Sequence, residues 1–170
     1  MIRSMTNKLN DNQDNNNNKN NKSLTNEQSS SPSNILSLDV GEARIGLAIG
    51  YSETKNVFPL KTINKKEATL KIKNLIKEKN ISFIVSGLPL NEDNKETTTS
   101  QKVRTFVKKL SEDNNNIPYV FIDEFFSSYE AKERLNIKTS DKKTRDSGVI
   151  DAMSAAIILE RYFANENIIV

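Results

Sequence analysis

Residues 35–51 read ILSLDVGEARIGLAIGY, and this stretch decides the fold. Two apolar runs, 35–39 and 44–51, are separated by only a few residues, which is typical of two antiparallel strands joined as a hairpin. Gly41 permits the turn between them and a close backbone approach by a phosphate or a metal ion. Asp39 ends the first strand. It either serves a binding site or bonds its own turn backbone, and the residues alone favour neither role.

Outside this hairpin the pattern alternates between strands and helices. A third strand is predicted over 57–63, where Pro59 favours a sheet edge or a bulge. Apolar strands over 81–86 and 119–123 each follow a segment of helical periodicity. The predicted helices cover residues around 68–76, 103–110, 127–135 and 147–164. An antiparallel meander followed by βαβ crossovers predicts an α/β protein with a mixed five-stranded sheet flanked by helices on both faces.

The composition limits which side chains can act as catalytic groups or metal ligands. The chain of 170 residues has a net charge of +3 and contains no Cys and no His. This excludes Ser–His and Cys–His nucleophiles and zinc sites built from imidazole or thiolate, so carboxylates, Lys, Tyr or water must do the chemistry. Residues 1–34 are rich in Asn and poor in apolar residues, and we expect a disordered tail before a folded domain over 35–170. No apolar run is long enough to span a membrane and no signal-peptide core is present, which predicts a cytoplasmic protein without a membrane partner.

Three acidic positions stand where a regular element begins or ends. Asp39 and the Asp123–Glu124 pair follow buried strands, and Asp151 opens an apolar helix. Neighbouring strand residues point to opposite faces, so only one of Asp123 and Glu124 can face the same cleft as Asp39, and the pattern does not say which. Carboxylates at the margin of a core are costly unless satisfied, and a divalent cation satisfies them well. The alternative for the later two positions is a helix N-terminal acid favoured by the helix dipole.

Basic residues near these acids suggest contacts to a nucleic-acid backbone. Arg44 lies close to Asp39 in the sequence, and a polar linker before the last helix carries Lys142, Lys143 and Arg145. Such residues give salt-dependent binding to phosphates, although a solvated lysine-rich loop has the same composition.

Four segments in this order resemble the YqgF/RuvX family. They are DVGEARIGLA from Asp39, VSGLPLN from Val85, the Asp123–Glu124 pair, and DAMSAAIIL from Asp151. That family is related to the RuvC Holliday-junction resolvases, and the resemblance, which covers residues 35–163, implies the ribonuclease H-like fold. It also implies a nuclease of ribosome biogenesis that processes the 5′ end of pre-16S rRNA, with resolution of four-way DNA as the alternative.

The resemblance also implies roles for individual residues. Asp39, Glu124 and Asp151 correspond to the family's metal-binding acids, which selects Glu124 over Asp123, and Arg44 corresponds to the basic residue beside the first acid. We therefore predict a phosphodiester hydrolase in which these acids are catalytic and hold Mg²⁺ or Mn²⁺, with two ions about 4 Å apart. Its expected partner is structured RNA or branched DNA.

One departure from the family pattern stands beside the middle acid, where Phe125 replaces an Arg. This loss keeps open a non-catalytic RNA-binding factor that assists ribosome assembly. A third reading is an ATPase, because Asp-x-Gly after a first strand also opens the phosphate loop of actin-like and sugar-kinase folds. Those proteins need two such domains, and a single domain of this size argues against them.

Overall fold

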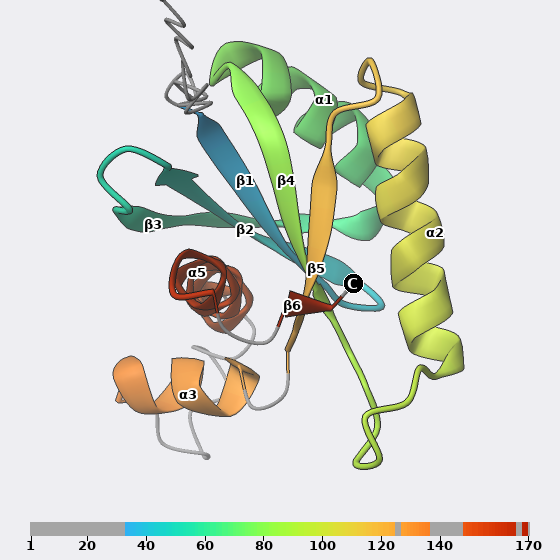
Figure 1. Cartoon of the computed structure of the whole chain (residues 1–170), viewed down its shortest axis with the longest axis vertical. Helices are drawn as coiled ribbons and strands as arrows, with labels where there is room; N and C mark the ends of the chain where they lie inside the picture. The colour runs from blue at the N-terminus through green and yellow to red at the C-terminus, as the bar shows by residue number, and fades with distance from the viewer. Residues whose placement is uncertain (1–32, 125–126, 137–147, 166–167, 170) are drawn as a thin grey trace, which may run out of the picture.

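The computed structural model describes residues 33–124, 127–136, 148–165 and 168–169, and within them one mixed sheet with helices on both faces (Figure 1). The strands are β1 (Asn34–Val40), β2 (Arg44–Tyr51), β3 (Val57–Asn64), β4 (Ile81–Leu88), β5 (Tyr119–Asp123) and β6 (Ile168–Ile169). The helices are η1 (Lys65–Glu67), α1 (Ala68–Glu78), α2 (Thr98–Glu112), α3 (Ser127–Arg134) and α5 (Val149–Phe163). The predicted class, an α/β protein with a mixed sheet flanked by helices on both faces, is confirmed.

The sheet has the strand order β3-β2-β1-β4-β5-β6. Strands β1, β2 and β3 form the predicted antiparallel meander, and β4 and β5 are parallel to β1. The carboxyl ends of β1, β4 and β5 therefore lie at one edge of the sheet, where ligands bind in open sheets of this kind. Pro59 lies on edge strand β3 beside a register shift between Leu47 and Ala48 of β2, as predicted for a residue without a backbone donor.

The predicted strand count was wrong by one. The sixth strand, β6, has only two residues and pairs antiparallel with Phe121 and Ile122 of β5. Two residues cannot show the alternation that identifies a strand, so only the tertiary pairing reveals it.

The alternation of β1 assigns its side chains to two different cores. Leu36 and Leu38 are fully buried in the cluster that includes Ile72 of α1 and Val107 of α2. Ser37 and Asp39 have the opposite parity and face the side covered by α5. Figure 1 shows the two layers, with α1 and α2 on one face of the sheet and α3 and α5 on the other.

Small residues on β2 allow α5 to lie close to the sheet. A Cβ atom at Gly46 would collide with the backbone carbonyl of Asp151, and one at Gly50 would lie 2.7 Å from Leu159 Cδ2. Between them, Ala48 packs against alanines of α5. Because Gly46 is also the cross-strand partner of Asp39, this packing brings the first turn of α5 beside the end of β1.

Two predicted segments fall outside the described residues. They are the Asn-rich tail, apart from its last two residues, and the charged linker that contains Lys142, Lys143 and Arg145. Within the described ranges, no helix is both long and apolar enough to cross a bilayer.

Candidate active site

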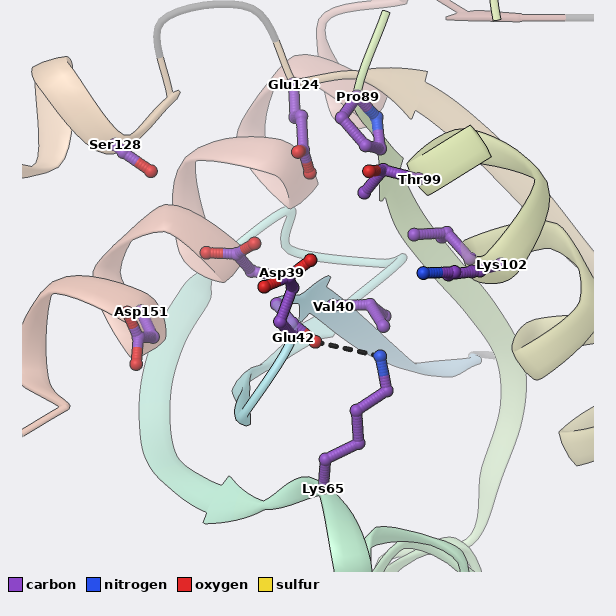
Figure 2. A pocket seen from close by; sticks show the side chains of 12 residues that line it. Asp39, Val40, Glu42, Lys65, Pro89, Thr99, Lys102, Glu124, Ser128 and Asp151 are labelled. Atoms are coloured by element: carbon purple, nitrogen blue, oxygen red, sulfur yellow. Dashed lines mark hydrogen bonds between the residues drawn. The ribbon is translucent and has the colours of Figure 1, made fainter. Parts of the chain in front are cut away.

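The three acids come from three elements and line one pocket of about 390 Å³ (Figure 2). Asp39 lies near the end of β1, Glu124 directly follows β5, and Asp151 stands in the first turn of α5. The pocket is thus at the carboxyl edge of the sheet, where residues of α2, α3 and α5 also line it.

The Glu124 side chain reaches the pocket because the neighbouring residue of β4, Gly87, has no side chain. A Cβ atom at Gly87 would lie 2.5 Å from Glu124 Oε2 and 2.7 Å from Ile158 Cδ1. Any larger residue would fill the space that the carboxylate occupies. Asp123 does not line the pocket, as the alternation of side chains requires for its neighbour.

The carboxylate of Glu124 is held without a full set of partners. Its Oε2 atom is buried and accepts no hydrogen bond from any described residue. A buried acceptor without a donor is costly, and a bound cation is one way to satisfy it.

Asp151 has a cationic partner from β2. The Nε atom of Arg44 lies 3.0 Å from Asp151 Oδ2, and both side chains are partly exposed. Arg44, predicted from the sequence to contact phosphate, is therefore engaged with one of the acids. Arg44 also lines a smaller pocket together with Asp39 and Asp151.

The electrostatic environment raises the pKa of all three acids. Burial raises the pKa of Asp39 to about 7, with repulsion from Asp151 adding to the rise. Burial also raises the pKa of Glu124 to about 8, and the charges of Asp39 and Asp123 contribute. Burial raises the pKa of Asp151 as well, while the Arg44 guanidinium opposes that rise. Perturbed carboxylates grouped in one pocket are typical of a functional site.

These acids do not converge on a single point. Among the described residues, no three acidic side chains are arranged as a ready ligand set for one ion. Asp39 interacts electrostatically with both Glu124 and Asp151, but the Asp151 carboxylate forms its ion pair with Arg44. The donor chemistry nevertheless suits a hard divalent cation, since all three groups offer carboxylate oxygens and one oxygen of Glu124 is buried without a donor.

Two serines that the sequence argument overlooked lie behind the acids. Ser37 and Ser154 are fully buried, and neither hydroxyl oxygen has a hydrogen-bond partner of ordinary geometry in the described part of the chain. Ser154 still lies near enough to Asp39 to lower its pKa. The signal was available in the sequence, because Ser154 is one helical turn after Asp151 and Ser37 has the strand parity of Asp39.

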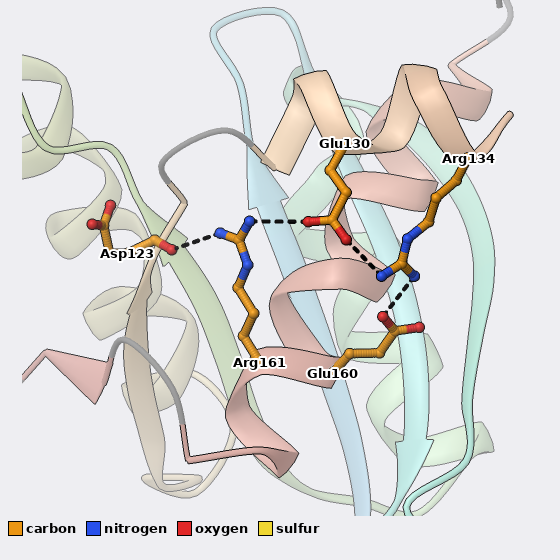
Figure 3. A network of polar contacts seen from close by, with 5 residues as sticks. All are labelled: Asp123, Glu130, Arg134, Glu160 and Arg161. Atoms are coloured by element: carbon orange, nitrogen blue, oxygen red, sulfur yellow. Dashed lines mark hydrogen bonds and ion pairs between the residues drawn. The ribbon is translucent and has the colours of Figure 1, made fainter. Parts of the chain in front are cut away.

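An ionic network braces the chain just before Glu124 (Figure 3). Arg161 of α5 donates from Nη1 to the Asp123 carbonyl at 3.3 Å and pairs through Nη2 with Glu130 of α3 at 3.1 Å. Arg134 extends the network to Glu160 and to Glu130, each at 2.6 Å. The network ties α3 to α5 and fixes the backbone that carries Glu124.

Fold and site together define an α/β protein with a mixed sheet and an acidic pocket at the carboxyl edge of that sheet. Residues 33–165 match the family model described as "RuvX: Holliday junction resolvase". The chain belongs to this family.

Named relatives agree with that assignment. A Prochlorococcus marinus (strain MIT 9301) protein named "Putative pre-16S rRNA nuclease" is 38% identical over 136 residues, which cover 77% of this chain and 84% of the relative. A Fusobacterium nucleatum protein of the same name is 31% identical, with coverage of 75% and 94%. Among solved structures, Thermus thermophilus RuvC with a Holliday junction substrate has a TM-score of 0.48 at 10% identity, covering 78% of this chain and 94% of RuvC.

Proposed function

We propose that this protein is a metal-dependent nuclease that processes the 5′ end of pre-16S rRNA. The observation that carries the proposal is the meeting of Asp39, Glu124 and Asp151 in one pocket at the carboxyl edge of the sheet. The names of the relatives supply the substrate, and family membership supports phosphodiester hydrolysis. We assign the activity to the domain that begins near residue 35, after the Asn-rich tail.

In this proposal the three acids hold the cations. Two Mg²⁺ or Mn²⁺ ions would neutralise the carboxylates and supply Lewis-acid activation of water and phosphate, as in two-metal nucleases. Asp39 and Glu124 would bind in their ionised forms, and binding would therefore compete with the protons that burial holds on them. Asp151 would join them by exchanging its contact with Arg44, and the guanidinium would then contact a phosphate oxygen.

The basic linker gives the proposal a second set of phosphate contacts. Lys142, Lys143 and Arg145 come shortly before α5, whose first turn carries Asp151. Their proposed role is to bind the substrate backbone next to the acids.

The arrangement of Asp151 also favours a second candidate, a non-catalytic RNA-binding factor. The described acids do not form a ready three-ligand set, and Phe125 replaces the family's Arg. A single comparison separates the candidates, because only the nuclease requires a divalent cation to act on RNA.

The test is cleavage of precursor 16S rRNA and of a four-way DNA junction in Mg²⁺, in Mn²⁺ and in EDTA. We expect metal-dependent cleavage of the RNA, reduced at least a hundredfold by Asp39→Asn. Glu53→Gln, an exposed change in the turn at the other end of the sheet, is the matched control. Cleavage by a folded Asp39→Asn protein at the wild-type rate would refute the proposed mechanism. RNA binding without cleavage in any metal would favour the non-catalytic factor, and selective cleavage of the junction would assign DNA as the substrate.

A further inference from the structure

The acidic pocket has a second wall that is basic. Besides the acids it is lined by Lys65, at the start of η1, and by Lys102 and Thr99 of α2. In Figure 2 Lys102 lies on the side of the pocket opposite Asp151, and Lys65 rises from below with its ammonium group at the turn after Asp39. Neither lysine belongs to the motifs that identify the family, and both come from parts of the chain distant from the acids.

Lys65 is fixed in place by the hairpin turn that follows Asp39. Its Nζ donates to the Gly41 carbonyl at 2.9 Å, and its backbone N–H donates to the Ala43 carbonyl at 3.0 Å. An ammonium group has three donors. The contact with Gly41 uses one of them and leaves two for a ligand in the pocket.

Lys102 differs from the other lysines near it on α2. Lys108 and Lys109 each have an acid four residues later and pair with it, at 3.9 Å to Glu112 and 3.4 Å to Asp113. The residue four positions after Lys102 is Phe106, and no described carboxylate lies within ion-pair distance of the Lys102 ammonium. Its position one turn after Thr99 and beside Val103 directs it to the pocket rather than along the helix.

The two lysines do not serve as counterions for the acids. Four carboxylates line the pocket, from Asp39, Glu42, Glu124 and Asp151, yet none of them forms an ion pair with Lys65 or Lys102 among the described residues. A pocket with an acidic wall and a basic wall suits a polyanion that binds together with metal ions. A phosphodiester backbone is such a ligand. Metal ions held by the acids can bind one of its phosphates, and the lysine ammonium groups can bind the neighbouring phosphate.

We propose that Lys65 and Lys102 form a phosphate-binding wall that holds the nucleic-acid backbone next to the scissile phosphate. The proposal rests on the proposed nuclease function and adds two binding residues to it. Lysines that contact phosphates position the strand and read no bases, so the effect extends to any sequence. Lys65 additionally links the bound strand to the turn after Asp39.

The experiment measures binding apart from cleavage. Anisotropy of a fluorescein-labelled hairpin RNA with a single-stranded extension is titrated with protein in EDTA, from 50 to 300 mM KCl. The proteins are wild type, Lys65→Gln, Lys102→Gln, the double variant, and Lys109→Gln as a control from the same helix. Thermal unfolding by circular dichroism shows that each variant is folded.

Each lysine change in the wall is expected to weaken binding three- to tenfold at 100 mM KCl. Each should also reduce the slope of log Kd against log salt by about 0.7 to 0.9, the release of one counterion. Lys109→Gln should change neither quantity. Wild-type affinity and slope in folded Lys102→Gln and Lys65→Gln proteins would overturn the proposal, as would absence of RNA binding by the wild type.

The outcome separates this proposal from the nuclease proposal. If the lysine variants lose affinity but the wild type cleaves nothing in Mg²⁺ or Mn²⁺, the phosphate-binding wall stands and the nuclease proposal fails. If the wild type cleaves and the lysine variants bind normally, the nuclease proposal stands and the wall is wrong.

Discussion

Replacing Glu124 by Gln should make the metal-free protein gain stability relative to the wild type as the pH rises from 5 to 8, although it removes a residue of the proposed site. Burial raises the pKa of Glu124 from its ordinary value of 4.5 to about 8. The folded protein therefore keeps a proton up to about pH 8 that the unfolded chain releases near pH 4.5. Because the folded state binds more protons over this window, the wild type loses stability as the pH rises through it.

The size of this stability change follows from the one extra proton that the folded state binds. One proton held only by the folded state changes the free energy of unfolding by about 1.4 kcal/mol per pH unit, or at most about 4 kcal/mol from pH 5 to pH 8. Asp39 repels Glu124 and titrates in the same pH range. Part of the pH-dependent stability change therefore belongs to Asp39 and remains in the Glu124→Gln variant. We expect the difference between Glu124→Gln and wild type to shift by about 2 to 3 kcal/mol in favour of the variant.

Urea unfolding followed by far-ultraviolet circular dichroism measures this difference at pH 5, 6, 7 and 8 in EDTA. The change between pH values matters more than the difference at any one pH, because packing of the Gln amide contributes equally at all of them. Glu53→Gln, an exposed residue far from the pocket, controls for loss of a carboxylate. A difference between Glu124→Gln and wild type that stays constant from pH 5 to pH 8 would refute the argument that Glu124 is held protonated by burial.

Three further changes test how the site is built. Gly87→Ala should keep the fold at a cost of about 1 to 3 kcal/mol but weaken Mg²⁺ binding at least tenfold by calorimetry, since the new methyl group displaces Glu124; unchanged Mg²⁺ affinity would contradict this. Ser154→Ala should raise the pKa of Asp39 further and move the acid limb of the pH–rate profile to higher pH, and an unmoved limb would show that the hydroxyl does not act on Asp39. Arg161→Ala should lower the free energy of unfolding in urea by about 1 to 2 kcal/mol, because it removes a charged donor to the carbonyl before Glu124; a smaller loss than from Lys109→Gln would show that the network is not structural.

Local patterns in the sequence were sufficient for most of the fold. Short apolar runs in β1 and β2, continuous apolar character in β4 and β5, and helical periodicity elsewhere predicted the order of the elements. They missed β6, whose two residues have no measurable period. The position of Pro59 at an edge strand was also predictable, because it depends on one missing donor.

The candidate acids could be predicted one at a time, but their environment could not. The absence of His and Cys and the position of each acid at the end of an element were visible in the sequence. That Arg44 pairs with Asp151 depends on Gly46, which admits the first turn of α5 against β2. This contact joins two residues that are more than a hundred positions apart in the chain.

The sequence by itself determined which residues are strand, helix and candidate acid, because those properties follow from periods of two and 3.6 residues and from side-chain chemistry. Only the tertiary structure decided what surrounds the acids. Gly46 and Gly87 are ordinary strand glycines in the sequence. In the fold, Gly46 leaves space for the first turn of α5, which carries Asp151, and Gly87 leaves space for the Glu124 carboxylate. Lys65 and Lys102 carry no motif, and they face the pocket only because the sheet register and the position of α2 bring them there. Strand register and helix packing depend on contacts between distant segments, and no local pattern records those contacts.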